Sequence, residues 1–232
     1  MTAPRPVVTF DLFSALIDSR TGGSAGFETL ARAHGWAVSG QQLYDAWDPR
    51  NKAAQRDCPA WEPWRGPAGR AVAAAYASLG IEGVVAEGIV AEGVEALTGS
   101  MPDWPLWPDV PAGLRDLATK RRVGLLSNVD DDLFARTAAV DLVDHDVALT
   151  SERLQVYKPH PGIYRGAVDG WGPLVHVATS ARDVRGALEA GIPVVRLRRP
   201  GHELDPNGPR PSHEITSTSE LPEVLASLDR PG

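Results

Sequence analysis

Short apolar runs alternate with helix-like patterns along most of the chain. The first run, residues 7–10, is followed at once by a carboxylate, Asp11. Residues 18–100 then carry apolar side chains at helical spacing. From residue 110 onward the pattern predicts helices at 110–120, 131–139, 161–168, 183–190 and 221–228, and strands at 122–126, 146–150, 174–178 and 194–197. This alternation predicts an α/β fold, a parallel sheet with helices on both faces.

The long helical stretch divides the predicted fold into two units. Residues 1–17 and 101–232 are expected to form a Rossmann-like core domain, and residues 18–100 an inserted helical cap domain. An insertion after the first strand lies over the carboxyl end of that strand, where open α/β sheets place their binding sites. Residues 200–213 are rich in proline, glycine and charge, and are expected to form a surface loop.

Composition narrows the classes of partner. The chain has 232 residues, of which 43% are hydrophobic and 23% charged, as in an ordinary globular protein. Its net charge of −7 argues against a nucleic-acid-binding surface, which needs clustered lysine and arginine. An anionic small-molecule substrate is still compatible, because a few local cations can dominate one pocket.

The sequence favours a cytoplasmic protein. Its single cysteine, Cys58, cannot form an internal disulfide, which fits a reducing compartment. No apolar run reaches membrane-spanning length, and residues 1–6 lead into the first strand without the apolar core of a signal peptide. We therefore expect no membrane partner. A homodimer formed through the helices of residues 18–100 stays possible.

The most informative position is Asp11, at the end of the first strand. Position 13 points to the same side of an extended chain, and it holds Phe13 rather than a second acid. The site would then offer a nucleophilic carboxylate without a neighbouring general acid. The alternative is that Asp11 only caps the turn that follows.

Further polar side chains follow the predicted strands. Ser127 and Asn128 end one strand, and Asp183 begins the helix after another. Lys158 lies in a turn that two prolines make rigid, so its ammonium group has a well-defined position. Each has an ordinary alternative: a helix cap for Ser127, Asn128 and Asp183, and a solvated surface charge for Lys158.

Taken together, these segments resemble the motifs of the haloacid dehalogenase-like hydrolase superfamily, as a divergent member of its L-2-haloacid dehalogenase branch. The most specific match is residues 157–164, which read Tyr-Lys-Pro-x-Pro-x-x-Tyr. The resemblance implies a nucleophile at Asp11, and Phe13 where phosphatases of the superfamily carry a second acid. It further implies catalytic roles for Lys158, Ser127, Asn128 and Asp183, and substrate contacts from Phe13, Ser14, Tyr164, Ser180 and Trp47.

Some positions depart from that family. Ser14 and Ala15 stand where the family has Gly-Thr, so a hydroxyl that orients the nucleophile is missing at position 15. The family also binds the substrate carboxylate with an arginine that follows a tryptophan of the cap, whereas here Trp47 is followed by Asp48. The candidate replacements are Arg50, Arg56 and Arg65.

No cofactor is expected. Phe13 and Thr179 occupy the places of metal-binding acids in the family, which leaves few hard oxygen ligands for Mg²⁺. The resemblance thus favours a metal-independent reaction, although a weak Mg²⁺ site at Asp11 and Asp183 stays open.

Three functions remain open from the sequence. The leading one is a metal-independent hydrolase in which Asp11 attacks carbon and forms an ester, with a 2-haloacid as substrate and water activated near Asp183. The second is a catalytically divergent protein of the same fold that binds a ligand or partner. The third is a phosphatase, which would need a general acid that Phe13 cannot supply.

Overall fold

A computed structural model describes residues 6–81 and 87–229 of the chain. The described residues form a six-stranded sheet in the order β3-β2-β1-β4-β5-β6, in which every neighbouring pair is parallel. The strands are β1 (Val7–Phe10), β2 (Val123–Ser127), β3 (Ala148–Thr150), β4 (Leu174–Ala178), β5 (Val194–Leu197) and β6 (His213–Ile215). The first strand lies between β2 and β4 at the centre of the sheet. The predicted parallel α/β fold is confirmed.

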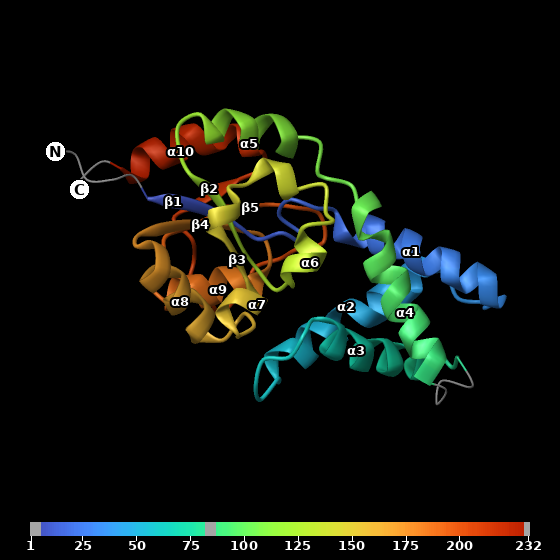
Figure 1. Cartoon of the computed structure of the whole chain (residues 1–232). Coiled ribbons are helices and arrows are strands. Elements are labelled where there is room, and N and C mark those ends of the chain that lie inside the picture. The colour runs from blue at the N-terminus through green and yellow to red at the C-terminus, as the bar shows by residue number, and fades with distance from the viewer. Residues whose placement is uncertain (1–5, 82–86, 230–232) are drawn as a thin grey trace.

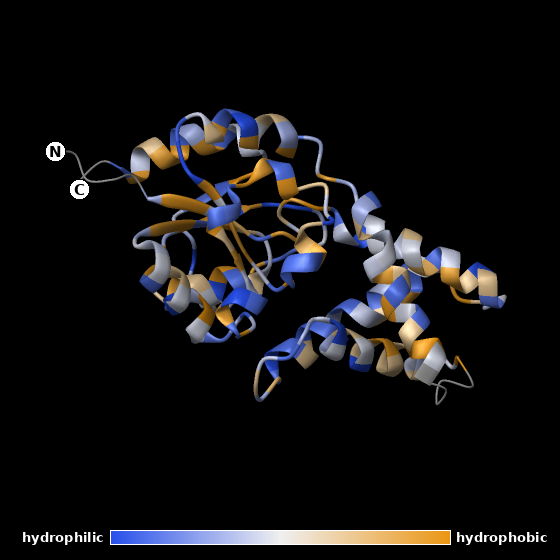
Figure 2. Ribbon diagram, in the orientation of Figure 1, coloured by the Kyte–Doolittle hydropathy of each residue, from blue (hydrophilic) through white to orange (hydrophobic). Residues whose placement is uncertain are grey.

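Helices cover both faces of the sheet (Figure 1). One face carries α5 (Val110–Ala118) and α10 (Leu221–Leu228), and the other carries α8 (Pro161–Trp171) and α9 (Ala181–Glu189). Because side chains alternate along a strand, Val8 and Phe10 join the hydrophobic cluster on the first face, whereas Val7 joins the cluster on the second. Figure 2 shows the hydrophobic strands enclosed by helices of mixed hydropathy. Asp11, the next residue after Phe10, therefore points toward the α8 and α9 side.

Between β1 and α5 the chain forms a helical unit, defined here as α1 (Ser19–His34), α2 (Gly40–Arg56), α3 (Arg65–Ser78) and α4 (Glu87–Ser100). Asp18 starts α1 by accepting a hydrogen bond from the Thr21 amide, and Ser39 starts α2 in a capping box with Gln42. Figure 1 shows this unit beside the sheet. None of the described helices combines the length and apolar character that crossing a membrane requires.

Parts of the two predicted domains lie outside the described residues. These are residues 1–5, which we expected to lead into the first strand, residues 82–86 within the helical stretch, and residues 230–232.

Two local predictions are corrected by the structure. The predicted helix 131–139 is only α6 (Asp131–Phe134), because the Thr137 amide and hydroxyl both bond to the Phe134 carbonyl and close a turn there. The predicted loop 200–213 is followed at its end by β6, which pairs with β5. The remaining short elements are α7 (Ser151–Leu154) and the 3₁₀ turns Met101–Asp103, Val140–Leu142, His145–Val147 and Thr218–Glu220.

The helical unit depends on a close crossing of α1 and α2 at Gly40. A Cβ atom at this position would overlap the carbonyl oxygen of Ser24 and the backbone nitrogen of Glu28, both in α1. The Gly40 amide also donates to the Glu28 carboxylate at 2.7 Å. Backbone atoms cannot yield as a flexible side chain would, so glycine is required here.

Replacing Gly40 by alanine should lower the free energy of unfolding by at least about 1 kcal/mol, the usual effect of overpacking. The matched control is Gly170→Ala in α8, where no atom lies within 4 Å of the added methyl group. That change should raise the free energy of unfolding by about 0.5–1 kcal/mol, because alanine favours a helix. Urea denaturation measures both, and equal effects would contradict the assigned crossing.

Candidate active site

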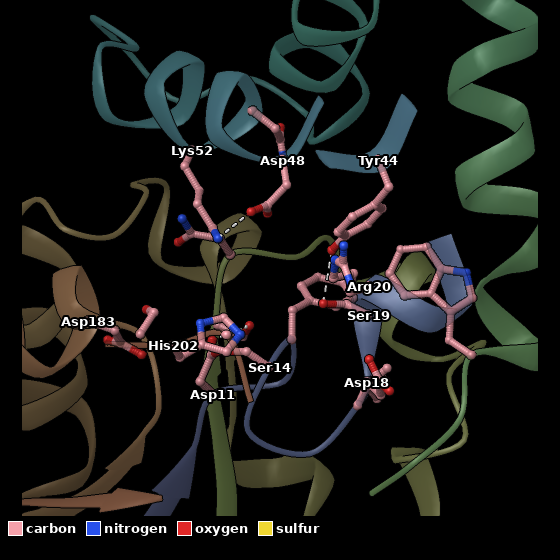
Figure 3. A pocket seen from close by; sticks show the side chains of 18 of the residues that line it. Asp11, Ser14, Asp18, Ser19, Arg20, Tyr44, Asp48, Lys52, Asp183 and His202 are labelled. Carbon is pink, nitrogen blue, oxygen red and sulfur yellow. Dashed lines mark hydrogen bonds and ion pairs between the residues drawn. The ribbon is translucent and has the colours of Figure 1, made fainter. Parts of the chain in front are cut away.

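A cavity of about 640 Å³ lies between the carboxyl ends of the strands and the helical unit. Its floor comes from residues that follow β1, β2, β4 and β5, and its roof comes mainly from α1 and α2 (Figure 3). Much of the wall is aromatic: Phe13, Tyr44, Trp47, Trp64, Trp104 and Trp107. A cavity of this size and lining has room for a small organic ligand.

The carboxylate of Asp11 lies on the cavity floor and is held by three donors. Its Oδ1 accepts hydrogen bonds from Ser127 Oγ at 3.1 Å and from Lys158 Nζ at 3.2 Å. Its Oδ2 accepts from Ser14 Oγ at 3.3 Å. The Leu12 amide donates to Ser127 Oγ at 3.3 Å, which orients that hydroxyl toward Asp11. With 13% of its side chain exposed, Asp11 can still meet a ligand.

Lys158 is buried between two carboxylates. Its ammonium group lies 3.2 Å from Asp11 Oδ1 and 2.6 Å from Asp183 Oδ2. His176 of β4 lies beneath this pair, with Nε2 3.1 Å from Asp183 Oδ2 and Nδ1 3.0 Å from Thr9 Oγ1. The lysine thus compensates both acids, and the positions of β1, β4 and α9 depend on it.

Asp183 is held in its ionised form. Burial acts to raise the pKa of its carboxyl, but the positive charge of Lys158 and the contacts with His176 outweigh burial and keep that pKa well below its usual value. Tyr164 donates to Asp183 Oδ1 at 2.9 Å, and burial together with the negative charge of Asp183 raises the pKa of Tyr164 well above its usual value. A Cβ atom at Gly186 would overlap the Tyr164 ring, so this glycine lets α8 and α9 approach.

Asn128 and Gln55 connect the sheet to the helical unit. Asn128 accepts from the Lys158 amide at 2.7 Å and donates to the Lys158 carbonyl at 3.1 Å, which fixes the turn that carries the lysine. Its Nδ2 also donates to Gln55 Oε1 of α2 at 2.9 Å. Arg182 of α9 donates to the same Gln55 oxygen at 3.3 Å and to the Lys52 carbonyl at 3.1 Å.

The other cations of the cavity differ in how they are paired. Lys52 lies 2.5 Å from Asp48, and Arg20 forms two hydrogen bonds with Asp45. Arg182 bonds only to neutral oxygens, and it has no ion pair with a carboxylate among the residues that the structure describes. Its positive charge is therefore available to an anionic ligand.

The structure brings most of the predicted site residues to one place. The cavity is lined by Asp11, Phe13, Ser14, Trp47, Ser127, Asn128, Lys158, Ser180 and Asp183. Their assigned roles stay predictions, whereas their proximity is observed.

Two predicted substrate contacts lie elsewhere. Tyr164 is fully buried behind Asp183 and does not line the cavity. Arg50 also does not line it, because it lies on the other side of α2 and donates to the Ala46 carbonyl at 2.6 Å. The other candidates, Arg56 and Arg65, pair with Asp57 and Glu95.

Sequence reasoning missed several polar residues of the cavity: Gln55, Lys52, Arg182 and His202. Some signals were present. Lys52 lies one helical turn after Asp48, and Gln55 lies two turns after Trp47, so both share the face of α2 that carries Trp47. Arg182 directly precedes Asp183. His202 follows β5, at the same edge of the sheet as Asp11.

The sequence left open a weak Mg²⁺ site at Asp11 and Asp183. In the structure Lys158 bridges these two carboxylates. Its ammonium group stands between Asp11 and Asp183 and bonds to both. Across residues 6–81 and 87–229, no group of three or more His, Cys, Asp or Glu side chains is arranged to hold a metal ion.

The chain resembles known dehalogenases in sequence over about half its length and in fold over nearly all of it. No family model matches it. It is 31% identical over 127 residues to (S)-2-haloacid dehalogenase 4A of Burkholderia cepacia, a match that covers 52% of this chain and 55% of that protein. The chain thus spans about half the length of the curated relatives it matches.

Solved structures extend the likeness to the whole fold. L-2-haloacid dehalogenase from Xanthobacter autotrophicus has a TM-score of 0.78 at 19% identity, with 97% of this chain and 99% of that one covered. A structure of the same enzyme with chloropropionic acid covalently bound gives a TM-score of 0.78 at 18% identity, covering 97% and 100% of the two chains. At these identities the likeness establishes the fold.

Ser14 combines a strained backbone with a contact to Asp11. Its φ of 77° lies in the left-handed region that favours glycine. Ser14→Gly and Ser14→Ala both remove the hydroxyl, so both lose the hydrogen bond to Asp11 Oδ2. They differ in strain, and the glycine variant should be more stable than the alanine variant by about 1 kcal/mol in urea denaturation. An alanine variant as stable as the glycine variant would contradict the strain.

Proposed function

We propose that this chain, a divergent relative of the L-2-haloacid dehalogenases in the haloacid dehalogenase-like superfamily, is a metal-independent hydrolase that removes halide from a 2-haloalkanoic acid. The observation that carries the proposal is the geometry at Asp11. Oδ1 accepts hydrogen bonds from both Lys158 and Ser127, whereas Oδ2 accepts a single, longer one from Ser14. One oxygen is thereby fixed and the other is available for attack.

In the first step Asp11 Oδ2 attacks C2 of the substrate. A bond forms between Oδ2 and C2 while the carbon–halogen bond breaks, and halide leaves with the electron pair. The product is an ester of Asp11. The Lys158 ammonium donates to Oδ1 and so orients the carboxylate for this attack.

In the second step water attacks Cγ of the ester. Negative charge then develops on Oδ1, and the Ser127 hydroxyl and the Lys158 ammonium already donate to that oxygen. Donors placed in advance at a developing oxyanion are among the largest contributions to catalysis. When the tetrahedral intermediate collapses, the bond between Cγ and Oδ2 breaks. Oδ2 stays on C2, so the 2-hydroxy acid leaves with an oxygen from Asp11.

Phe13 fits halide displacement better than phosphate ester hydrolysis. Halide departs without a proton, whereas an alkoxide needs a general acid. Position 13 lines the cavity as an aromatic side chain, packed edge-on against Trp104 with ring centroids 5.7 Å apart. The phosphatase alternative is therefore not favoured.

We assign the substrate carboxylate to Arg182. In the family whose motifs the sequence resembles, this role belongs to an arginine that follows a tryptophan of the cap, and here Asp48 follows Trp47. Arg182 enters the same cavity from the core helix α9, and no carboxylate within the described part of the chain pairs with its charge. An anionic organic acid of small size fits this arrangement.

We further propose that residues 18–100 act as a cap domain on a core of residues 1–17 and 101–232. Asp18 caps α1 and Ser100 ends α4, so the helical unit begins and ends near those positions. The lone Cys58, with no second cysteine in the chain, supports a reducing cytoplasmic location.

Oxygen labelling tests the nucleophile. With enzyme in excess over 2-chloropropionate, in H₂¹⁸O and with EDTA present, the label should enter Asp11 and not the product of the first turnover. Mass spectrometry of the Asp11 peptide measures this. Asp11→Asn should lower halide release by at least about 10³-fold, since it removes the nucleophile. Label that appears in the product first would contradict the ester.

Arg182→Gln tests the carboxylate site. Loss of a charged hydrogen bond costs about 1.5–3 kcal/mol, so kcat/KM for 2-chloropropionate should fall about 10- to 150-fold. The uncharged 2-chloropropionamide should be affected much less. The matched control is Arg185→Gln, which lies on the same helix and pairs with Glu189 and Asp205 outside the cavity. Equal losses on acid and amide would contradict the assignment.

A further inference from the structure

The second step of the proposed reaction requires a base, and Asp183 is poorly suited to be one. Its carboxylate is only 2% exposed, and both of its oxygens accept hydrogen bonds. Lys158 and His176 hold the pKa of this group well below its usual value against the opposing effect of burial. A carboxylate stabilised in this way has little tendency to take a proton from water.

His202 is a better-placed group that the mechanism has not used. It lines the cavity, and its ring makes no hydrogen bond to any residue in the described ranges 6–81 and 87–229. In the view of Figure 3 the imidazole lies above Asp11, between that carboxylate and Lys52 of the helical unit. His202 and Asp11 line the same cavity, and the charge of Asp11 acts on the imidazole.

The loop that carries His202 is anchored on both sides. Arg196 of β5 donates to the His202 carbonyl at 2.7 Å, and the His202 amide donates to the Arg199 carbonyl at 3.4 Å. Arg199 in turn pairs with Asp109 at 2.8 Å and donates to the Ala15 carbonyl in the loop that follows Asp11. The backbone of His202 is thus anchored, through Arg199, to the loop that follows Asp11.

The charges around His202 favour its neutral form. Burial and the positive charge of Lys52 lower its pKa from the usual 6.5, and Arg196 acts in the same direction. Asp48 on α2 and Asp11 on the floor oppose these effects without outweighing them. Near neutral pH the ring can therefore accept a proton.

We infer that His202 is the general base that activates water for hydrolysis of the Asp11 ester. The inference rests on the proposed function. One imidazole nitrogen takes a proton as the water oxygen bonds to Cγ of Asp11. When the tetrahedral intermediate collapses, the protonated ring gives that proton to the departing alkoxide, which yields the 2-hydroxy acid. The second proton of the water stays on the new carboxyl oxygen of Asp11 and is then released to solvent. His202 ends the cycle neutral, and Asp11 regains its carboxylate with one oxygen from water.

The test separates the two chemical steps with 2-chloropropionate as substrate. Rapid quench measures chloride release, and mass spectrometry measures the ester on the Asp11 peptide. In His202→Gln the first equivalent of chloride should appear at the wild-type rate, while ester accumulates and steady-state turnover falls about 10²- to 10⁴-fold. His145→Gln, an exposed histidine outside the cavity, is the matched control and should keep wild-type turnover.

Two further measurements guard against a folding defect in the variant. Added imidazole should restore ester hydrolysis in His202→Gly. In the wild type, the rate of ester hydrolysis should rise with pH through one ionisation below 6.5 and then level off, since only the neutral ring accepts a proton.

The outcomes distinguish this inference from the proposed function. If the wild type turns over and His202→Gln turns over equally fast, the role of His202 is overturned. The same holds if the variant slows chloride release and ester hydrolysis to the same degree. Neither result affects the proposed function. A wild-type chain that releases no halide from 2-haloalkanoic acids overturns the proposed function, and this inference with it.

Discussion

The burial of one ammonium group between two carboxylates is the constraint on which the rest of the site depends. An isolated buried charge is very costly, and removal of one partner of a buried pair leaves the other uncompensated. Lys158 can be 3% exposed only because Asp11 and Asp183 lie on either side of it. These three residues belong to the end of β1, a turn before α8, and α9, so their charge balance fixes three distant segments together.

The sequence was sufficient for most of the fold because strong, repeated signals specify it. Buried parallel strands are short and apolar throughout, as in β1, and the turns between them have polar residues that cap helices. The strand β6 was missed because it has only three residues, and two of them, His213 and Glu214, are polar. The short α6 was overestimated because its end is set by the hydroxyl of Thr137, which apolar spacing does not show.

Some residues of the site could also be predicted from the sequence, and others could not. Strand ends are visible in a sequence, and they led to Asp11, Ser127 and Asp183. The direction in which a helix turns its polar side is not visible in that way. In α2 the cavity face carries Tyr44, Trp47, Asp48, Asn51, Lys52 and Gln55, and the 3.6-residue period places Arg50 on the far side. Gln55 and Arg182 meet only because two segments 127 residues apart pack together, and no local pattern records that.

Asn128 and Arg182 donate to the same oxygen of Gln55, which links the position of the helical unit to the order of the residues on the cavity floor. Gln55 Oε1 belongs to the helical unit, while both donors belong to the sheet side. Any separation wide enough to admit a ligand breaks these hydrogen bonds and exposes Asn128, which holds the turn of Lys158. The same amide of Asn128 thus meets the helical unit through Gln55 and the turn of Lys158 through its backbone, so the position of the helical unit and the position of the lysine are linked through one side chain.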